Sequence, residues 1–118
     1  MSMKNLKKAA AGGGILANQI LGAAHVLPTL GRMVDTIRGR MDRQRAGKTF
    51  HNTEAQFAQI MADKLGRCVS IVEYNHPDAG YYATNRAIAA YQAKGLPGVI
   101  EVIESVIKDA EGLASLTD

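Results

Sequence analysis

The stretch that decides the fold is LKKAAAGGGILANQILGAAHVLPTLGRMVDTIRGRM, residues 6–41. Apolar or small residues recur in it at alternating spacings of three and four, which is typical of one face of a helix and is close to a heptad seam. The residues of this seam are Leu6, Ala9, Gly13, Leu16, Ile20, Ala23, Leu27, Leu30, Val34, Ile37 and Met41. The pattern therefore predicts a long helical element with one continuous apolar stripe.

Glycine and proline interrupt the pattern at two places. Three consecutive glycines, residues 12–14, each cost about 1 kcal/mol relative to alanine in a helix interior. They predict a hinge or a break, although packing against another backbone would hold them helical. Pro28 lacks an N–H group, so it either begins a new helix or kinks a continuous one. The seam keeps its register across Pro28, and both alternatives remain open.

Local signals divide the rest of the chain into helices. Gly47 suits a helix C-terminus and begins a linker, residues 47–52. Thr53 and Gln56 form a capping-box pattern that predicts the start of the next helix. Residues 67–74 are rich in β-branched side chains and allow a strand as the alternative, but the helical register continues through them.

Turn residues predict the last two helices. Asp78 is a good N-cap for an alanine-rich helix that continues to Lys94. Gly95 ends that helix, and Pro97 lies near the first position of the last one. Valine and isoleucine follow at a period of 3.6, which indicates a helix and not a strand.

The predicted fold class is therefore all-α, with four to five helices. Residues 1–47 form an elongated N-terminal element, and residues 48–118 form a compact C-terminal bundle. Only the second part offers faces that can cover each other, so we expect the seam to pack against other copies or other proteins. The predicted interface residues are Leu16, Ile20, Ala23, Leu27, Leu30, Val34, Ile37 and Met41.

The net charge of +3 conceals an asymmetry along the chain. Residues 1–50 contain nine lysines and arginines and two acidic residues, whereas residues 51–118 contain five and nine. Such polarity indicates a polyanion or a membrane bound at one end, or head-to-tail packing between copies.

Basic residues gather at the end of the seam, and they are the strongest candidates for a binding site. They are Arg32, Arg38, Arg40, Arg43, Arg45 and Lys48. Arginines on a helix can neutralise the phosphates of DNA or of anionic lipids. The alternative is a solvated flank that pairs with acidic residues such as Glu101, Glu104 and Glu111 of a neighbour. No aromatic residue lies within the cluster, which argues against stacking of single-stranded bases.

The sequence predicts no catalytic, metal or cofactor site, and it shows no evident small-molecule substrate. The glycine run lacks the residues of a phosphate-binding loop. His25, His51 and His76 lie too far apart for helical metal ligands at i and i+4. Cys68 is the only cysteine and falls on an apolar helix face, so we expect a buried, inert thiol. Tyr81, Tyr82 and Tyr91 are expected to cover the core beside their helix.

The uncharged segment at residues 9–31 is long enough to cross a bilayer, but its amides, glycines and histidine make it a poor membrane helix. We expect it to be buried against other chains, with small residues allowing close backbone approach. The N-terminus carries no convincing signal peptide. A virion or cytoplasmic location is favoured.

In composition and layout the chain resembles the small helical virion proteins of tailed bacteriophages, including ejected internal proteins. The resemblance lies in the basic lead MSMKNLKK, residues 1–8, followed by the Gly/Ala-rich uncharged segment, residues 9–31. It implies a multi-copy structural role near DNA or membrane, and no residue-level site. The expected function is therefore a non-enzymatic, homo-oligomeric assembly subunit. The alternative is a small protein that binds nucleic acid or a membrane surface through the basic residues 32–48.

Overall fold

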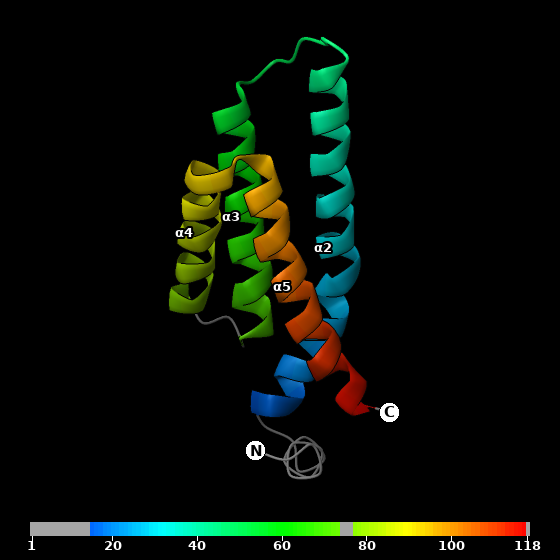
Figure 1. Cartoon of the computed structure of the whole chain (residues 1–118). Helices are drawn as coiled ribbons and strands as arrows, with labels where there is room; N and C mark the ends of the chain where they lie inside the picture. Colours follow the sequence, from blue (N-terminus) through cyan, green and yellow to red (C-terminus); the bar gives the residue numbers. More distant parts are fainter. Residues whose placement is uncertain (1–14, 74–76, 118) are drawn as a thin grey trace.

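The computed structural model describes residues 15–73 and 77–117, and within these ranges the chain is all-helical, with four α-helices and no strand (Figure 1). The helices are α2 (Ile15–Arg45), α3 (Glu54–Val72), α4 (Pro77–Lys94) and α5 (Leu96–Ala114), followed by a short 3₁₀ turn, η1 (Ser115–Thr117). The predicted all-α class is confirmed.

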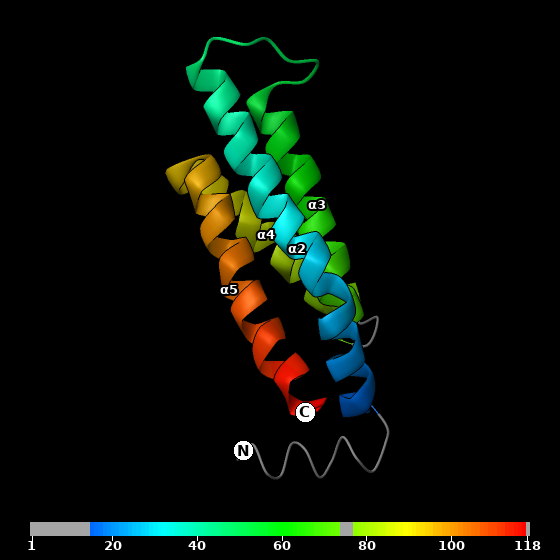
Figure 2. The same cartoon turned by 90° about the vertical axis from the view of Figure 1, so that its right-hand side faces the viewer.

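The helices form an elongated bundle that measures 53 × 25 × 22 Å (Figure 1). α2 packs against α3 and α5, and α4 packs against α3 and α5 on the other side of the bundle. α2 and α3 extend beyond the turn that joins α4 to α5, so the loop between α2 and α3 lies at one end of the molecule (Figures 1 and 2). We call this end, residues 40–54, the tip.

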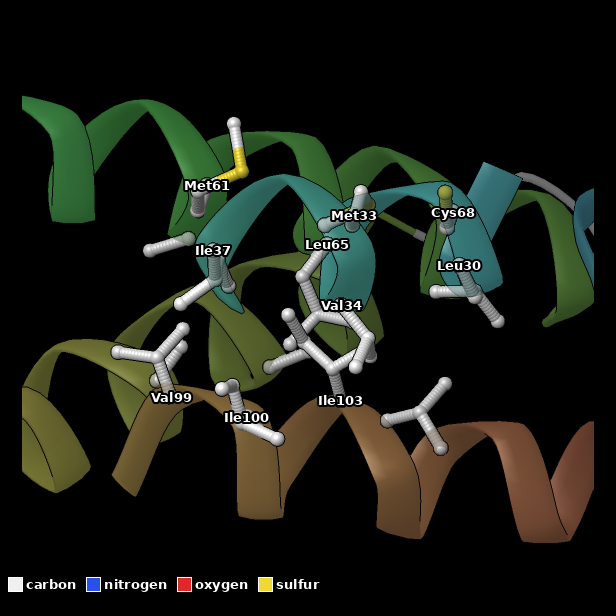
Figure 3. Close-up of a cluster of buried hydrophobic side chains, with 14 of the residues drawn as sticks. Leu30, Met33, Val34, Ile37, Met61, Leu65, Cys68, Val99, Ile100 and Ile103 are labelled. Carbon is white, nitrogen blue, oxygen red and sulfur yellow. The ribbon is translucent and has the colours of Figure 1, made fainter. Parts of the chain in front are cut away.

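The apolar stripe of α2 is the inner face of the bundle. Leu30 and Ile37 are fully buried, and side chains of α3 and α5 face them (Figure 3). One continuous core joins all four helices. Its α2 members are Ala23, Val26, Leu30, Met33, Val34 and Ile37, with Leu27 and Met41 packed at its margin, and Ile20 is also buried.

The expectation that this stripe lacks cover within its own chain is wrong. Periodicity shows which face of a helix is buried but does not show what buries it. Here α5, more than fifty residues further along the chain, covers much of the stripe. Pairing of the seam with another copy stays a prediction, and in this fold it would require α2 to separate from α3 and α5. The side chain of Leu16 and residues 1–14 lie outside the described part of the chain.

The predicted division near residue 47 coincides with the loop after α2, but the core continues across it. α2 is thus part of the same packed unit as the helices that follow. No helix in the described ranges is both long and apolar enough to cross a membrane.

Pro28 lies inside α2, which continues through it as one helix. The proline ring removes the hydrogen bond that its N–H would give to the carbonyl of Ala24. Ala24 and Pro28 are both exposed, so water can reach that carbonyl group. The proline is tolerated because the missing bond lies on the solvent side of the helix.

Local signals predicted most helix ends correctly. Gly47 has a φ of 77°, and the Lys48 N–H donates to the Arg43 carbonyl at 3.0 Å, which closes the end of α2. Thr53 and Gln56 form the predicted capping box at the start of α3. Gly95 has a φ of 72° between α4 and α5. Asp78, however, is not the N-cap: α4 begins at Pro77, and Asp78 lies in its first turn.

α3 remains helical through Val72, so the alternative strand at residues 67–72 is wrong. Gly66 of α3 and Gly80 of α4 let these two helices approach closely. A Cβ atom on Gly80 would lie 2.5 Å from the Gly66 carbonyl oxygen. Thr84 donates across this contact to the Ala62 carbonyl at 3.2 Å. A similar close approach joins Gly22 of α2 to the backbone of Ile71, whereas a Cβ atom on Gly31 would meet no atom within 4 Å.

Candidate functional site

The six predicted polyanion-binding residues do not share one surface. Arg32 lies in the middle of α2 and donates to the Thr29 hydroxyl at 3.2 Å. Arg38 forms an exposed ion pair with Glu104 of α5 at 3.5 Å. The arginines were expected to pair with carboxylates such as Glu104 of a neighbouring copy, whereas here Arg38 pairs with Glu104 of its own chain. The other four basic residues belong to the tip.

Arg40 is buried, with 4% of its surface exposed, and is not available to a ligand. Its Nη1 and Nη2 donate to the Asn52 side-chain oxygen at 2.6 Å and to the Asn52 carbonyl at 3.0 Å. Its Nε donates to the Gln44 side-chain oxygen at 2.7 Å. Arg40 therefore anchors the end of the loop to α2, and its predicted contact with a polyanion is wrong.

Two aromatic rings complete the surroundings of Arg40. Its guanidinium carbon lies 3.7 Å from the centroid of the Phe50 ring and 5.0 Å from that of Phe57. Phe57 belongs to α3, and Phe50 belongs to the loop. A guanidinium stacks favourably on aromatic faces, and the stacking holds the loop against both helices.

A hydrogen-bonded chain extends from Arg40 to α4. Gln44 donates to the Glu54 carboxylate at 2.7 Å, and the Tyr91 hydroxyl donates to the other oxygen of Glu54 at 2.9 Å. Removal from water and then the bond to Glu54 raise the pKa of Tyr91, because both favour the neutral phenol. The tip is thus fixed to three helices at once.

The remaining basic side chains of the tip are exposed. Arg45 pairs with Asp42 one turn earlier on α2. Within the part of the chain that the structure describes, neither Arg43 nor Lys48 has a carboxylate partner. Both cations also stabilise α2 itself, because positive charges near a helix C-terminus interact favourably with the helix dipole.

Arg43 and Lys48 border an open hollow of about 560 Å³ on the outside of the tip. Its lining is Arg43, Lys48, Thr49, Phe50, His51 and Asn52. Of the six predicted basic residues, the structure therefore brings only Arg43 and Lys48 together in one concave site. We call it the tip hollow.

Sequence reasoning missed four residues of the tip hollow, residues 49–52. The expectation of a basic cluster without an aromatic side chain is wrong, because Phe50 lies in the same hollow as Arg43 and Lys48. The signal that could have found it is Gly47, whose positive φ reverses the chain after α2. His51, set aside as a metal ligand, also lines the tip hollow.

The other candidate residues that the structure describes do not line the tip hollow. Cys68 is buried in the core, as predicted, and burial raises the pKa of its thiol. His25 is exposed on α2, and His76 lies outside the described residues. No group of three or more potential metal ligands occurs in the described ranges.

Tyr81 and Tyr82 of α4 differ from expectation. They are 65% and 66% exposed, with ring centroids 5.9 Å apart, and therefore do not cover the core. Tyr91 alone of the three packs against the core.

Comparisons with protein families, with curated proteins and with solved structures find no match for this chain.

Proposed function

We propose that this protein is a small, non-enzymatic helical bundle that binds the phosphates of a polyanion, nucleic acid in the first place, through its tip. The observation that carries the proposal is the tip hollow, which both Arg43 and Lys48 line without a carboxylate partner in the described chain. Unpaired cations on a concave, protruding surface are suited to phosphate contacts without sequence preference.

The test compares two double variants that remove the same charge. Arg43→Gln with Lys48→Gln removes both cations of the tip hollow, whereas Arg32→Gln with Arg38→Gln removes two arginines outside it. Binding of a labelled DNA duplex is measured by fluorescence anisotropy at several salt concentrations. The first double variant should lower the log–log salt slope by about 1.8, since each lost phosphate contact contributes about 0.9. The second should leave it unchanged.

If both double variants lower the salt slope equally, net charge alone drives DNA binding and the tip is not the binding site. Failure of the wild-type protein to bind DNA with any salt dependence would refute nucleic-acid binding. Vesicles containing anionic lipid form a parallel arm, because lipid phosphates are the other source of the same chemistry.

A second candidate function is the assembly subunit that the resemblance to virion proteins implies. The observation in its favour is the outer face of α4, where Tyr81 and Tyr82 are both about two-thirds exposed. Tyrosine is enriched at protein interfaces because it combines a large apolar ring with a hydroxyl group. On this proposal, copies of the chain associate through α4 and not through the seam.

Sedimentation equilibrium of the wild type and of a variant with Tyr81→Ser and Tyr82→Ser tests assembly. The wild type should be heavier than a monomer, and the variant should lose mass while keeping its helical content. A monomeric wild type at high concentration would contradict this proposal. Substitutions at Leu30 or Ile37 cannot test assembly, because both side chains are fully buried in the core and their loss would unfold the bundle.

A further inference from the structure

The tip hollow contains an aromatic ring as well as cations. Phe50 is partly buried and lines the tip hollow together with Arg43 and Lys48. The guanidinium carbon of Arg43 lies 5.9 Å from the centroid of the Phe50 ring.

The ring is held in position before any ligand binds. The guanidinium of Arg40 stacks on it at 3.7 Å, and the same group holds Asn52 by two hydrogen bonds. Asn52 immediately precedes Thr53, the N-cap of α3. Residues on both sides of Phe50 are therefore fixed, at Gly47 by the end of α2 and at Asn52 by Arg40. A ring that is already ordered loses little conformational entropy when a ligand binds against it.

We infer that the tip hollow binds a nucleotide unit of single-stranded nucleic acid, with the base stacked on Phe50 and the phosphates on Arg43 and Lys48. This inference rests on the proposed function and specifies its ligand. Proteins that bind single strands combine a basic surface with aromatic side chains on which bases stack. The bases of a duplex are stacked on one another and cannot reach the ring. The volume of about 560 Å³ lies within the usual range of about 300–1,000 Å³ for small-ligand sites.

The experiment uses the absence of tryptophan from this chain. Phe50→Trp introduces a single tryptophan in the tip hollow, and its fluorescence reports a stacked base by quenching. The probes are oligothymidylate, oligouridylate and an abasic deoxyribose-phosphate oligomer, all with the same number of phosphates. Tyr82→Trp is the control, because it places the single tryptophan on the exposed face of α4.

Quenching of Phe50→Trp by the two base-bearing oligomers, but not by the abasic one, is expected, with no quenching of Tyr82→Trp. The wild type should bind oligothymidylate about 5- to 150-fold more tightly than the abasic oligomer, the range that stacking of one base supplies. In Phe50→Leu the affinity for oligothymidylate should fall to that for the abasic oligomer, and the affinity for the abasic oligomer should stay as in the wild type. Phe50→Tyr keeps the ring and should keep the ratio, which separates stacking from a change in folding. Equal behaviour of the thymidylate and uridylate probes would mean that the site accepts both DNA and RNA.

The outcomes distinguish this inference from the proposed function. If the abasic oligomer binds as tightly as oligothymidylate, or if Phe50→Leu keeps the ratio, base stacking is wrong although phosphate binding stands. Equal quenching at positions 50 and 82 would also overturn it. If no probe binds the wild type with any salt dependence, the proposed function fails and the inference fails with it.

Discussion

Arg40 is the only charged side chain that is buried in the described part of the chain. Its three nitrogens donate in three directions, to Gln44, to the Asn52 side chain and to the Asn52 carbonyl. Only the planar fork of arginine reaches all three acceptors while also stacking on Phe50. Arg40 thus converts a loop between two helices into an ordered surface.

Arg40→Lys should therefore behave as a disruptive substitution. A lysine supplies one compact ammonium group, so buried acceptors lose their donors and the stack on Phe50 is lost. We expect the free energy of unfolding to fall by about 2–4 kcal/mol, measured by urea denaturation. Arg38→Gln is the control, because it breaks only an exposed ion pair and should change the stability by about 1 kcal/mol or less. Similar effects for both substitutions would show that Arg40 does not anchor the loop.

The role of Arg40 could not be predicted from the sequence. Arg40 and Arg43 are both arginines and lie one turn apart on the same helix. Arg40 is nevertheless buried, whereas Arg43 borders the tip hollow. What separates them is the return of the loop and of Phe57, which are tertiary contacts. Chemical type alone therefore placed both in one predicted binding cluster.

At the level of helices, α3 and α4 cross in close contact at Gly66 and Gly80. A Cβ atom on Gly66 would lie 2.8 Å from the Gly80 carbonyl oxygen, so neither position has room for a side chain. The carbonyl group of the opposite glycine stands in the way at both positions, and the Thr84 hydroxyl also blocks a Cβ on Gly66. The distance between the two helices is therefore set by these glycines.

Gly80→Ala should lower the free energy of unfolding by about 1–3 kcal/mol, because overpacking forces the helices apart. Gly112→Ala is the matched control: Gly112 lies in α5 and a Cβ there would meet nothing within 4 Å. It should stabilise the protein by up to about 1 kcal/mol through helix propensity alone. Thermal and urea denaturation of both variants measure the difference. A stabilising effect of Gly80→Ala would mean that the crossing is loosely packed.

Helix ends were largely predictable, because their causes are local. The capping box at Thr53 and the positive φ of Gly47 and Gly95 depend on a few adjacent residues. Asp78 was placed one step wrongly because Pro77, the preceding residue, can itself begin a helix. The close approach at Gly66 and Gly80 was missed, since it depends on which two helices cross.

For the whole molecule, the all-α class was predictable from the sequence, and the described residues hold four of the four to five expected helices, but how α2 joins the rest was not predictable. The predicted stripe is the buried face, as Leu30 and Ile37 show. The helix that covers much of it, α5, is distant in sequence, so no local pattern pairs the two helices. Only the cations of the tip hollow, Arg43 and Lys48, were among the predicted residues, because they belong to the basic end of α2 and the adjoining loop. The Phe50 ring was not predicted, because the fold of the loop brings it beside them.

The inner face of α2 is synthesised well before the helix that covers much of it. From the end of α2 at Arg45 to the end of α5 at Ala114, about 70 residues must still be added. At about 5–20 residues per second, this takes roughly 3–14 seconds. During that interval the stripe of Leu30, Val34 and Ile37 lacks the cover that α5 gives it, and α3 is the only one of the two covering helices that can be complete. The helix that the sequence pattern predicts first thus receives the last part of its cover at the end of synthesis.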